Sequence, residues 1–228
     1  TSAGVTPGLQ RDVLVVPYNR PDLLEKVFQE HGHELAAAIC EPVFYNAGCV
    51  RPTEEFMATL RRLTREHSVV LIFDEVLCAF RMGPGGAQEY LGVTPDLCTL
   101  GKAVGGGYPL SIFGGRREIM ERLMPQGDCQ HSGTYNGHAM AVAAALAAVR
   151  VYREPGFYDH IRAIGEKLFA GLNEILARHS VPGRVQGLGA RCGIDLGIAE
   201  EVRDFHEAQQ HDRAMMLRFV KASIERGL

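Results

Sequence analysis

The feature that most constrains the fold is an uninterrupted apolar run at residues 69–73, which ends directly in Asp74 and Glu75. Such a run predicts a central parallel strand whose two faces are both covered by helices. Short apolar runs at 36–40 and 97–100 predict two more strands. Because helical patterns separate these runs through about residue 150, the sequence predicts an open α/β sheet with helices on both faces.

The remaining segments complete an alternating order of elements. Strands are expected at 13–16, 110–113, around Val185 and at 192–196, and helices at 21–31, from a Thr53 cap onward, and at 116–124, 139–152, 158–179 and 205–224. After residue 152 the pattern changes to a long helix followed by strands of a different sheet. We therefore expect part of a large domain at 1–152 and the start of a small domain at 153–228. The chain opens without Met, so we also expect a piece of a longer polypeptide.

Composition narrows the class of protein. A hydrophobic content of 46% and a charged content of 22% are ordinary for a globular chain, and the net charge of -3 indicates no nucleic-acid or anionic-membrane partner. No apolar run approaches the ~20 residues of a membrane span. The six cysteines lack the close Cys/His spacing of a zinc site, so we expect no metal and reduced, buried thiols in a cytoplasmic protein.

Three polar residues, Glu41, Asp74 and Lys102, come at the ends of predicted strands. Ligands bind outside the carboxyl ends of the strands in an open α/β sheet, so we expect all three to face one crevice. Taken singly, Asp74 also fits a helix cap or a salt bridge, and Lys102 fits an ordinary surface lysine. Together, a carboxylate and an amine at two strand ends favour a ligand site.

A lysine and a carboxylate in this arrangement suit the chemistry of pyridoxal 5′-phosphate (PLP). The amine must form a Schiff base with the cofactor aldehyde, and the carboxylate must keep the pyridine nitrogen protonated so that the ring withdraws electrons. The freed lysine can then carry the substrate proton. The glycines at 105–107 allow a tight turn but match no nucleotide-binding fingerprint. Gly133 and Thr134 precede an Ala-rich helix, where either a phosphate or an ordinary N-cap is expected.

Several segments, in one continuous order over about 10–225, resemble the signature of class III aminotransferases. They are 73–76, 80–81, 94–97, 100–109, 114–120, 133–134 and 136–137. The most similar subgroup is that of the glutamate-1-semialdehyde 2,1-aminomutases. The resemblance implies a PLP-dependent enzyme of fold type I, with a mostly parallel sheet sandwiched by helices, part of a small C-terminal α+β domain, and a homodimeric assembly.

The resemblance also implies roles for individual residues around the cofactor. Lys102 would bind PLP covalently, Asp74 would hold the pyridine nitrogen, and Val76 would lie on one face of the ring. Glu41 matches an acidic residue on the strand beside the cofactor. Asn46, where many ornithine-type members have Glu, resembles the aminomutase subgroup and would reach the phenolic oxygen of the cofactor.

Other matched positions bear on the partner subunit and on the substrate. Gly133 and Thr134 would contact the cofactor phosphate of the neighbouring subunit. Tyr135 and His138 differ from the aminomutase pattern, and Cys78 and Ala79 stand where the family usually has Thr-Gly. The resemblance places the group that reads the substrate carboxylate outside this chain.

Four functions remain open from the sequence. The first is a PLP-dependent transaminase of the aminomutase-like subgroup, which moves an amino group from an amine donor to a carbonyl acceptor. The second is glutamate-1-semialdehyde 2,1-aminomutase itself, and the third is a racemase on the same scaffold, because each needs the same Lys102 and Asp74. The fourth is a truncated, non-catalytic homologue, which the intact pair disfavours. A nucleotide-binding α/β protein is disfavoured because no glycine-rich segment of the chain has the residue order of a nucleotide-binding phosphate loop.

Overall fold

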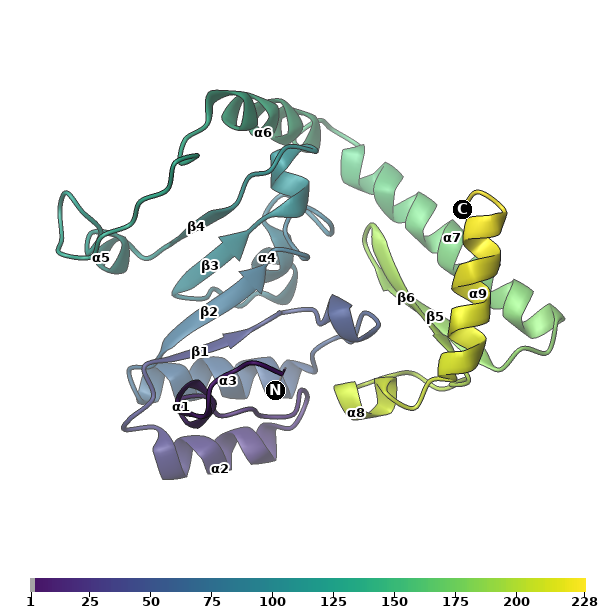
Figure 1. Ribbon diagram of the computed structural model, residues 1–228, viewed down its shortest axis with the longest axis horizontal. Coiled ribbons are helices and arrows are strands. Elements are labelled where there is room, and N and C mark those ends of the chain that lie inside the picture. Colours follow the sequence, from purple (N-terminus) through teal and green to yellow (C-terminus); the bar gives the residue numbers. More distant parts are fainter. Residues whose placement is uncertain (1–2) are drawn as a thin grey trace.

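The central sheet has four strands in the order β1-β2-β3-β4 within residues 3–228, the part of the chain that the computed structural model describes (Figure 1). The strands are β1 (Ala37–Cys40), β2 (Val70–Glu75), β3 (Leu97–Leu100) and β4 (Ile112–Gly115). The first three are parallel, and β4 is antiparallel to β3. β2 lies between two parallel neighbours, as its apolar sequence predicts, and its Leu71 and Phe73 are fully buried.

Helices α2 (Pro21–His31) and α3 (Glu54–Glu66) pack together along one side of this sheet (Figure 1). Thr53 caps α3 by accepting a hydrogen bond from the Phe56 N–H at 3.1 Å, as predicted. Apolar side chains of both helices meet those of β2 in one core. Its buried members include Leu24, Phe28, Phe56, Leu60, Leu63, Val69, Leu71 and Phe73. Burial of each of these larger side chains stabilises the fold by about 2–3 kcal/mol.

A second group of helices contacts the carboxyl ends of β2 and β3. The group comprises α4 (Gly86–Leu91), α6 (Ala139–Tyr152) and the short 3-10 helix η2 (Lys102–Gly105). Two further helices, α1 (Pro7–Arg11) and α5 (Arg117–Met120), have only five and four residues. α6 packs against η2, and the Tyr152 hydroxyl donates to the Ala103 carbonyl at 2.8 Å. A Cβ at Gly106 would meet Ala148 Cβ at 3.1 Å, so glycine permits this close approach. The turn that carries Lys102 is therefore fixed by α6.

The rest of the chain forms a separate antiparallel pair of strands with helices around it (Figure 1). Its elements are α7 (Phe157–Arg178), β5 (Gly183–Leu188), β6 (Arg191–Leu196), α8 (Phe205–Ala208) and α9 (Arg213–Glu225). Asn173 of α7 holds β5 through both ends of its amide: Nδ2 donates to the Val185 carbonyl at 2.8 Å, and Oδ1 accepts from the Val185 N–H at 2.9 Å. None of the helices in residues 3–228 combines the length and apolarity needed to cross a membrane.

Residues 13–16 form no strand, so that prediction is wrong. Val13 and Val15 are exposed, and no strand within 3–228 lies alongside them to supply the backbone hydrogen bonds that β structure needs. The strand predicted at 110–113 lies two residues later, as β4, because its pairing with β3 begins at Ile112.

Two predicted helices are shortened or divided. The helix predicted at 116–124 is limited to α5, because the following residues turn back on themselves. The helix predicted at 205–224 is divided into α8 and α9 by Asp212. The Asp212 N–H donates to the Leu196 carbonyl at 2.6 Å, and its carboxylate caps α9 by accepting from the Met215 N–H at 2.8 Å.

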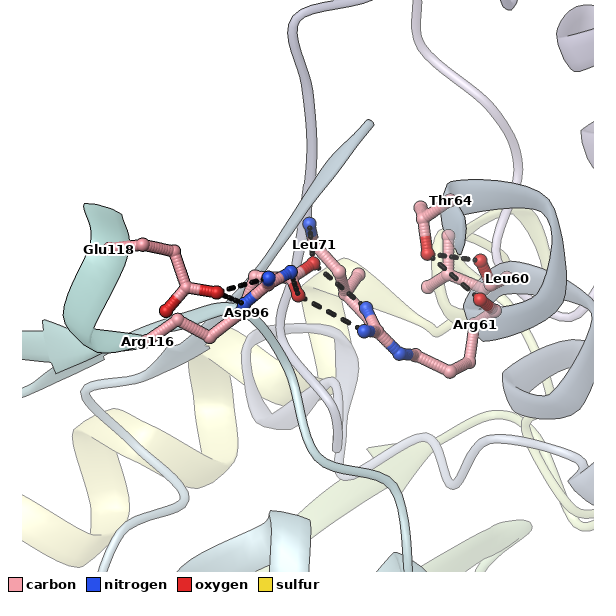
Figure 2. A network of polar contacts seen from close by, with 7 residues as sticks. All are labelled: Leu60, Arg61, Thr64, Leu71, Asp96, Arg116 and Glu118. Carbon is pink, nitrogen blue, oxygen red and sulfur yellow. Dashed lines mark hydrogen bonds and ion pairs between the residues drawn. The ribbon is translucent and has the colours of Figure 1, made fainter. Parts of the chain in front are cut away.

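A buried carboxylate, Asp96, joins several elements at the amino end of β3 (Figure 2). The Arg61 guanidinium of α3 donates two hydrogen bonds to it, at 2.8 and 3.0 Å, and Arg116 donates a third at 3.2 Å. The Leu71 N–H of β2 donates a fourth at 2.8 Å, and Glu118 binds the outer side of Arg116. The Arg61 hydrogen bonds, together with the others, lower the pKa of Asp96 to about 2.

We expect the Asp96→Asn substitution to lower the free energy of unfolding by about 3 kcal/mol at pH 7, because it leaves a largely buried arginine without its counter-charge. The folded-state pKa of Asp96 lies below its ordinary value of 3.8, so its contribution is present above pH 4 and lost as the pH falls toward 2. Urea unfolding at pH 7 and pH 3 tests this expectation. The exposed Asp128→Asn variant is the control, and equal stability of the two variants at pH 7 would contradict it.

Candidate cofactor-binding site

The carboxyl ends of β1, β2 and β3 meet at one edge of the sheet, and this edge carries Glu41, Asp74 and Lys102. The register sets Asp74 of β2 opposite Thr99 of β3. Cys40, the last residue of β1, pairs with Phe73 of β2, so Glu41 leaves β1 at the level of Asp74. Lys102 comes two residues after the last residue of β3. The parallel register thus places the three predicted residues on one edge of the sheet.

Asp74 is half-buried, and one of its carboxylate oxygens is fixed in place. Oδ1 accepts hydrogen bonds from the Val76 N–H at 3.0 Å and from the Thr99 hydroxyl at 3.3 Å. Within 3–228 no donor binds Oδ2, so this oxygen is free to accept a proton-bearing nitrogen. Thr99 was not predicted from the sequence as a site residue, although a hydroxyl in an otherwise apolar strand is a signal that could have identified it.

Glu75 has a different role from its neighbour, because side chains of a strand alternate between the two faces of the sheet. Its carboxylate is fully buried and binds the start of α4. It accepts from the Ala87 N–H at 2.7 Å and from Gln88 Nε2 at 2.9 Å. Burial raises the pKa of Glu75, and these hydrogen bonds oppose the rise. Glu75 therefore anchors a helix, and Asp74 is the carboxylate of the pair that faces the candidate site.

Lys102 lies in the left-handed region of the backbone map, with φ of 47°. This conformation is unfavourable for a side chain with a Cβ by roughly 1–2 kcal/mol and persists only where the surroundings impose it. Here α6 packs against η2 and imposes it. The lysine side chain is exposed, so its amine is accessible from a fixed point of the backbone.

Val76 follows β2 and lies against the end of β3. A Cβ at Gly101 would meet Val76 Cγ1 at 3.2 Å, so the glycine before Lys102 allows the two strand ends to approach closely. Val76 is only partly buried, which leaves apolar surface next to Asp74.

Glu41 and Asn46 form a hydrogen-bonded pair beside Asp74. Asn46 Nδ2 donates to Glu41 Oε1 at 2.6 Å, while Glu41 Oε2 is buried and has no hydrogen-bond partner among the described residues. Burial raises the pKa of Glu41; the Asn46 hydrogen bond opposes this rise, and the charge of Asp74 adds to it. The Tyr18 hydroxyl holds this strand end by donating to the carbonyls of Glu41 and Pro42 at 3.1 and 2.9 Å.

Gly133 and Thr134 are not part of this cluster within the chain. Both are exposed on the loop that leads from α5 to the start of α6 (Figure 1). η2 packs farther along α6, against Ala144 and Ala148. Because a helix rises 1.5 Å per residue, the start of α6 lies about 7–14 Å along its axis from that contact.

The residues of the edge fit PLP in charge and in shape. The amine of Lys102 suits an aldehyde, and the free Oδ2 of Asp74 suits a protonated ring nitrogen. Val76 offers apolar surface to a flat ring. The unpartnered Oε2 of Glu41 is a buried polar atom of the kind that a ligand or water satisfies.

Residues 12–227 match the family Aminotransferase class-III. The match extends over nearly the whole chain and includes every residue of the edge described above. The chain therefore belongs to the class III aminotransferases, an enzyme family, as the sequence resemblance implied.

Curated relatives support the same family assignment. The glutamate-1-semialdehyde 2,1-aminomutase of Thermomicrobium roseum is 40% identical over 225 residues, and that of Thermus thermophilus is 41% identical over 229 residues. The alignments cover 99% and 100% of this chain but 52% and 53% of the relatives. The chain thus spans about half the length of the curated relatives it matches.

Solved structures show the same fold. An omega-transaminase from Sphaerobacter thermophilus superimposes with a TM-score of 0.90 at 34% identity, over 100% of this chain and 52% of that one. A glutamate-1-semialdehyde aminomutase from Pseudomonas aeruginosa in complex with PMP superimposes with a TM-score of 0.80 at 30% identity, over 94% of this chain and 49% of that one. A transaminase with PLP bound superimposes with a TM-score of 0.78 at 28% identity, over 82% of this chain and 45% of that one. The predicted fold class is confirmed, and the family together with these neighbours indicates PLP as its cofactor.

We expect Glu41→Gln to be no less stable than the wild type at pH 7 and similar to it at pH 4. The raised pKa of Glu41 means that burial favours its protonated form, so wild-type stability falls as the pH rises from the ordinary value of 4.5 through the raised value. Gln cannot ionise but can still accept from Asn46. Thermal unfolding across this pH range measures the difference, with the exposed Glu166→Gln as control. A variant that loses stability relative to wild type as the pH rises would refute the expectation.

Proposed function

We propose that this chain is the cofactor-binding half of a PLP-dependent amino-group transferase. The observation that carries the proposal is the placement of Asp74 and Lys102 at the carboxyl ends of neighbouring parallel strands, in a chain of the class III aminotransferase family. Residues 1–152 would form part of the large domain and 153–228 the start of the small one, which agrees with the two separate sheets.

Each residue of the edge has a definite task in this proposal. Lys102 would hold the cofactor covalently through Nζ, and Asp74 would accept the ring N–H at Oδ2. Asp74 can keep this orientation because Val76 and Thr99 bind its other oxygen. Glu41 and Asn46 would lie beside the ring, and Val76 would supply apolar contact. PLP, when bound, supplies an electron sink for the carbon that loses a proton.

Lys102 also moves the substrate proton in this proposal. The Lys102 amine would act as general base and then as general acid, because its flexible four-carbon stem lets it take up a proton at one atom and return it at another. The strained backbone at φ of 47° fixes where the stem begins. The Asp74 carboxylate would accept the ring N–H and so favour the proton on the ring nitrogen.

We infer a transaminase of the aminomutase-like subgroup that takes an amino-acid or amine donor and a carbonyl acceptor. Glutamate-1-semialdehyde 2,1-aminomutase is the second candidate, supported by curated relatives of that name at 40% and 41% identity. The omega-transaminase neighbour at TM-score 0.90 supports the first. A racemase needs the same lysine and carboxylate and stays a third candidate.

We propose a homodimer in which Gly133 and Thr134 reach the cofactor phosphate of the neighbouring subunit. Their N–H groups precede α6, and helix starts favour phosphate. Apolar side chains along α6, including Met140 and Leu146, are more than half exposed in the chain alone, as expected of a face that another protein surface covers. The cytoplasmic location predicted from the cysteines stays a prediction.

Lys102 should be the residue that carries the cofactor. Borohydride reduction of the holoenzyme, followed by intact mass and peptide mapping, should place a phosphopyridoxyl group on Lys102. Lys102→Ala should lose the label, and Lys167→Ala, which removes an exposed lysine of α7, should keep it. A label on another lysine, or one that survives in Lys102→Ala, would falsify the assignment.

Asp74→Asn should retain measurable PLP binding but slow removal of the substrate proton by ~100-fold or more, because a neutral amide does not hold a proton on the ring nitrogen. Rapid-mixing absorbance with an amine donor, together with solvent deuterium exchange, measures this step. Asp128→Asn, an exposed carboxylate paired with Arg122, is the control. Near-normal exchange in Asp74→Asn would contradict the proposed role.

A further inference from the structure

Asn46 lies on a short closed loop, residues 44–50, that follows the end of β1. The first and last residues of the loop exchange two backbone hydrogen bonds, at 2.9 and 3.1 Å, and these close its base. The 3-10 helix η1 (Tyr45–Ala47) lies between them. Asn46 connects the loop to the cofactor edge through its hydrogen bond to Glu41. The position of this loop therefore decides whether that hydrogen bond forms.

The β5–β6 hairpin packs closely against the loop. A Cβ at Gly193 of β6 would clash with the Gly48 carbonyl, and a Cβ at Gly48 would meet a carboxylate oxygen of Asp195 at 3.1 Å. Gln186 of β5 adds a hydrogen bond from Nε2 to the Cys49 carbonyl at 3.2 Å. The contact thus has no room for an added side chain, and the backbone of the loop is held against both strands.

Tyr45 is the residue of η1 that is held through its side chain. The side chain is buried, and its hydroxyl donates to the carbonyl of Leu188, the last residue of β5, at 2.7 Å. The Arg191 guanidinium carbon lies 5.4 Å from the centre of the ring, a favourable place for a cation. Burial raises the pKa of Tyr45, so the hydroxyl remains a hydrogen-bond donor at neutral pH. Both the tip and the ring of Tyr45 are therefore fixed by the hairpin.

Tyr45 and Asn46 are adjacent, so the position of one determines the position of the other. Consecutive Cα atoms lie about 3.8 Å apart, and a shift of Tyr45 is passed on to Asn46 almost unchanged. The distance from Asn46 Nδ2 to Glu41 Oε1 is 2.6 Å. A shift of about 1 Å would take this pair out of hydrogen-bonding range. The contact between Tyr45 and Leu188 therefore bears directly on the cofactor edge.

We propose that Tyr45 is a positioning residue of the cofactor site, whose hydroxyl bond to Leu188 holds Asn46 against Glu41. The inference rests on the proposed function and goes beyond it, because it gives a role at the site to a hairpin that carries none of the residues of the edge. A purely structural role, in which Tyr45 only adds to the stability of the fold, is the alternative that the experiments must exclude.

The pKa of Glu41 reports the position of Asn46 without any cofactor. The Asn46 hydrogen bond lowers this pKa, so Tyr45→Phe, which fills the same space and removes only the hydroxyl, should raise it. Asp74 and Arg191 are the other charges that act on Glu41, and the variant retains both. A pH titration of the whole polypeptide with 13C-labelled glutamate, followed by NMR, measures the change.

Tyr158→Phe is the matched control for this titration, because it removes a buried tyrosine hydroxyl that has no partner among the described residues. It should leave the pKa of Glu41 unchanged. Asn46→Ala, which removes the donor itself, should raise that pKa at least as much as Tyr45→Phe does. An unchanged Glu41 pKa in Tyr45→Phe, beside a raised one in Asn46→Ala, would overturn the proposal.

The affinity for PLP supplies a second readout. The dissociation constant, followed by the absorbance of the bound cofactor, should rise about 3- to 10-fold in Tyr45→Phe. The double variant Tyr45→Phe/Asn46→Ala should bind PLP no more weakly than Asn46→Ala alone, because the hydroxyl acts through the asparagine. Additive losses would indicate the structural role and count against the proposal. A wild type that binds no PLP would refute the proposed function, and the Glu41 titration would still decide whether Tyr45 positions Asn46.

Discussion

The register of three parallel strands is the constraint on which the candidate site depends. Parallel strands deliver their carboxyl ends to one edge, and the pairing of Asp74 with Thr99 fixes which side chains are neighbours there. Asp96 secures this arrangement from the opposite end of β3, because its buried charge joins α3, β2 and the segment after β4. The Asp96 network thus ties the amino end of β3 to α3 and β2, at the end of the strand opposite the candidate site.

Much of this arrangement could be predicted from the sequence, because local patterns determine it. The apolar run before Asp74 indicates a buried parallel strand, and Thr53 and the Ala-rich segment define two helices. The failures also have physical causes. Residues 13–16 have the composition of a strand but lack a neighbouring strand, and the helix expected at 205–224 is interrupted by an aspartate whose backbone binds β6.

Contacts between residues far apart in the sequence could not be predicted in this way. The Thr99 hydroxyl reaches Asp74 across 25 residues, and the Tyr45 hydroxyl reaches Leu188 across 143. The Arg61 guanidinium likewise meets the Asp96 carboxylate across 35 residues.

The alternation of Asp74 and Glu75 in β2 has a consequence for how the family can vary. One carboxylate faces the site and the next anchors α4, and the two differ by a single step along the strand. Insertion or deletion of one residue in β2 would exchange their faces and disable both at once. Loops elsewhere tolerate changes in length, so variation in length should be confined to them, and β2 should keep a constant length among functional members.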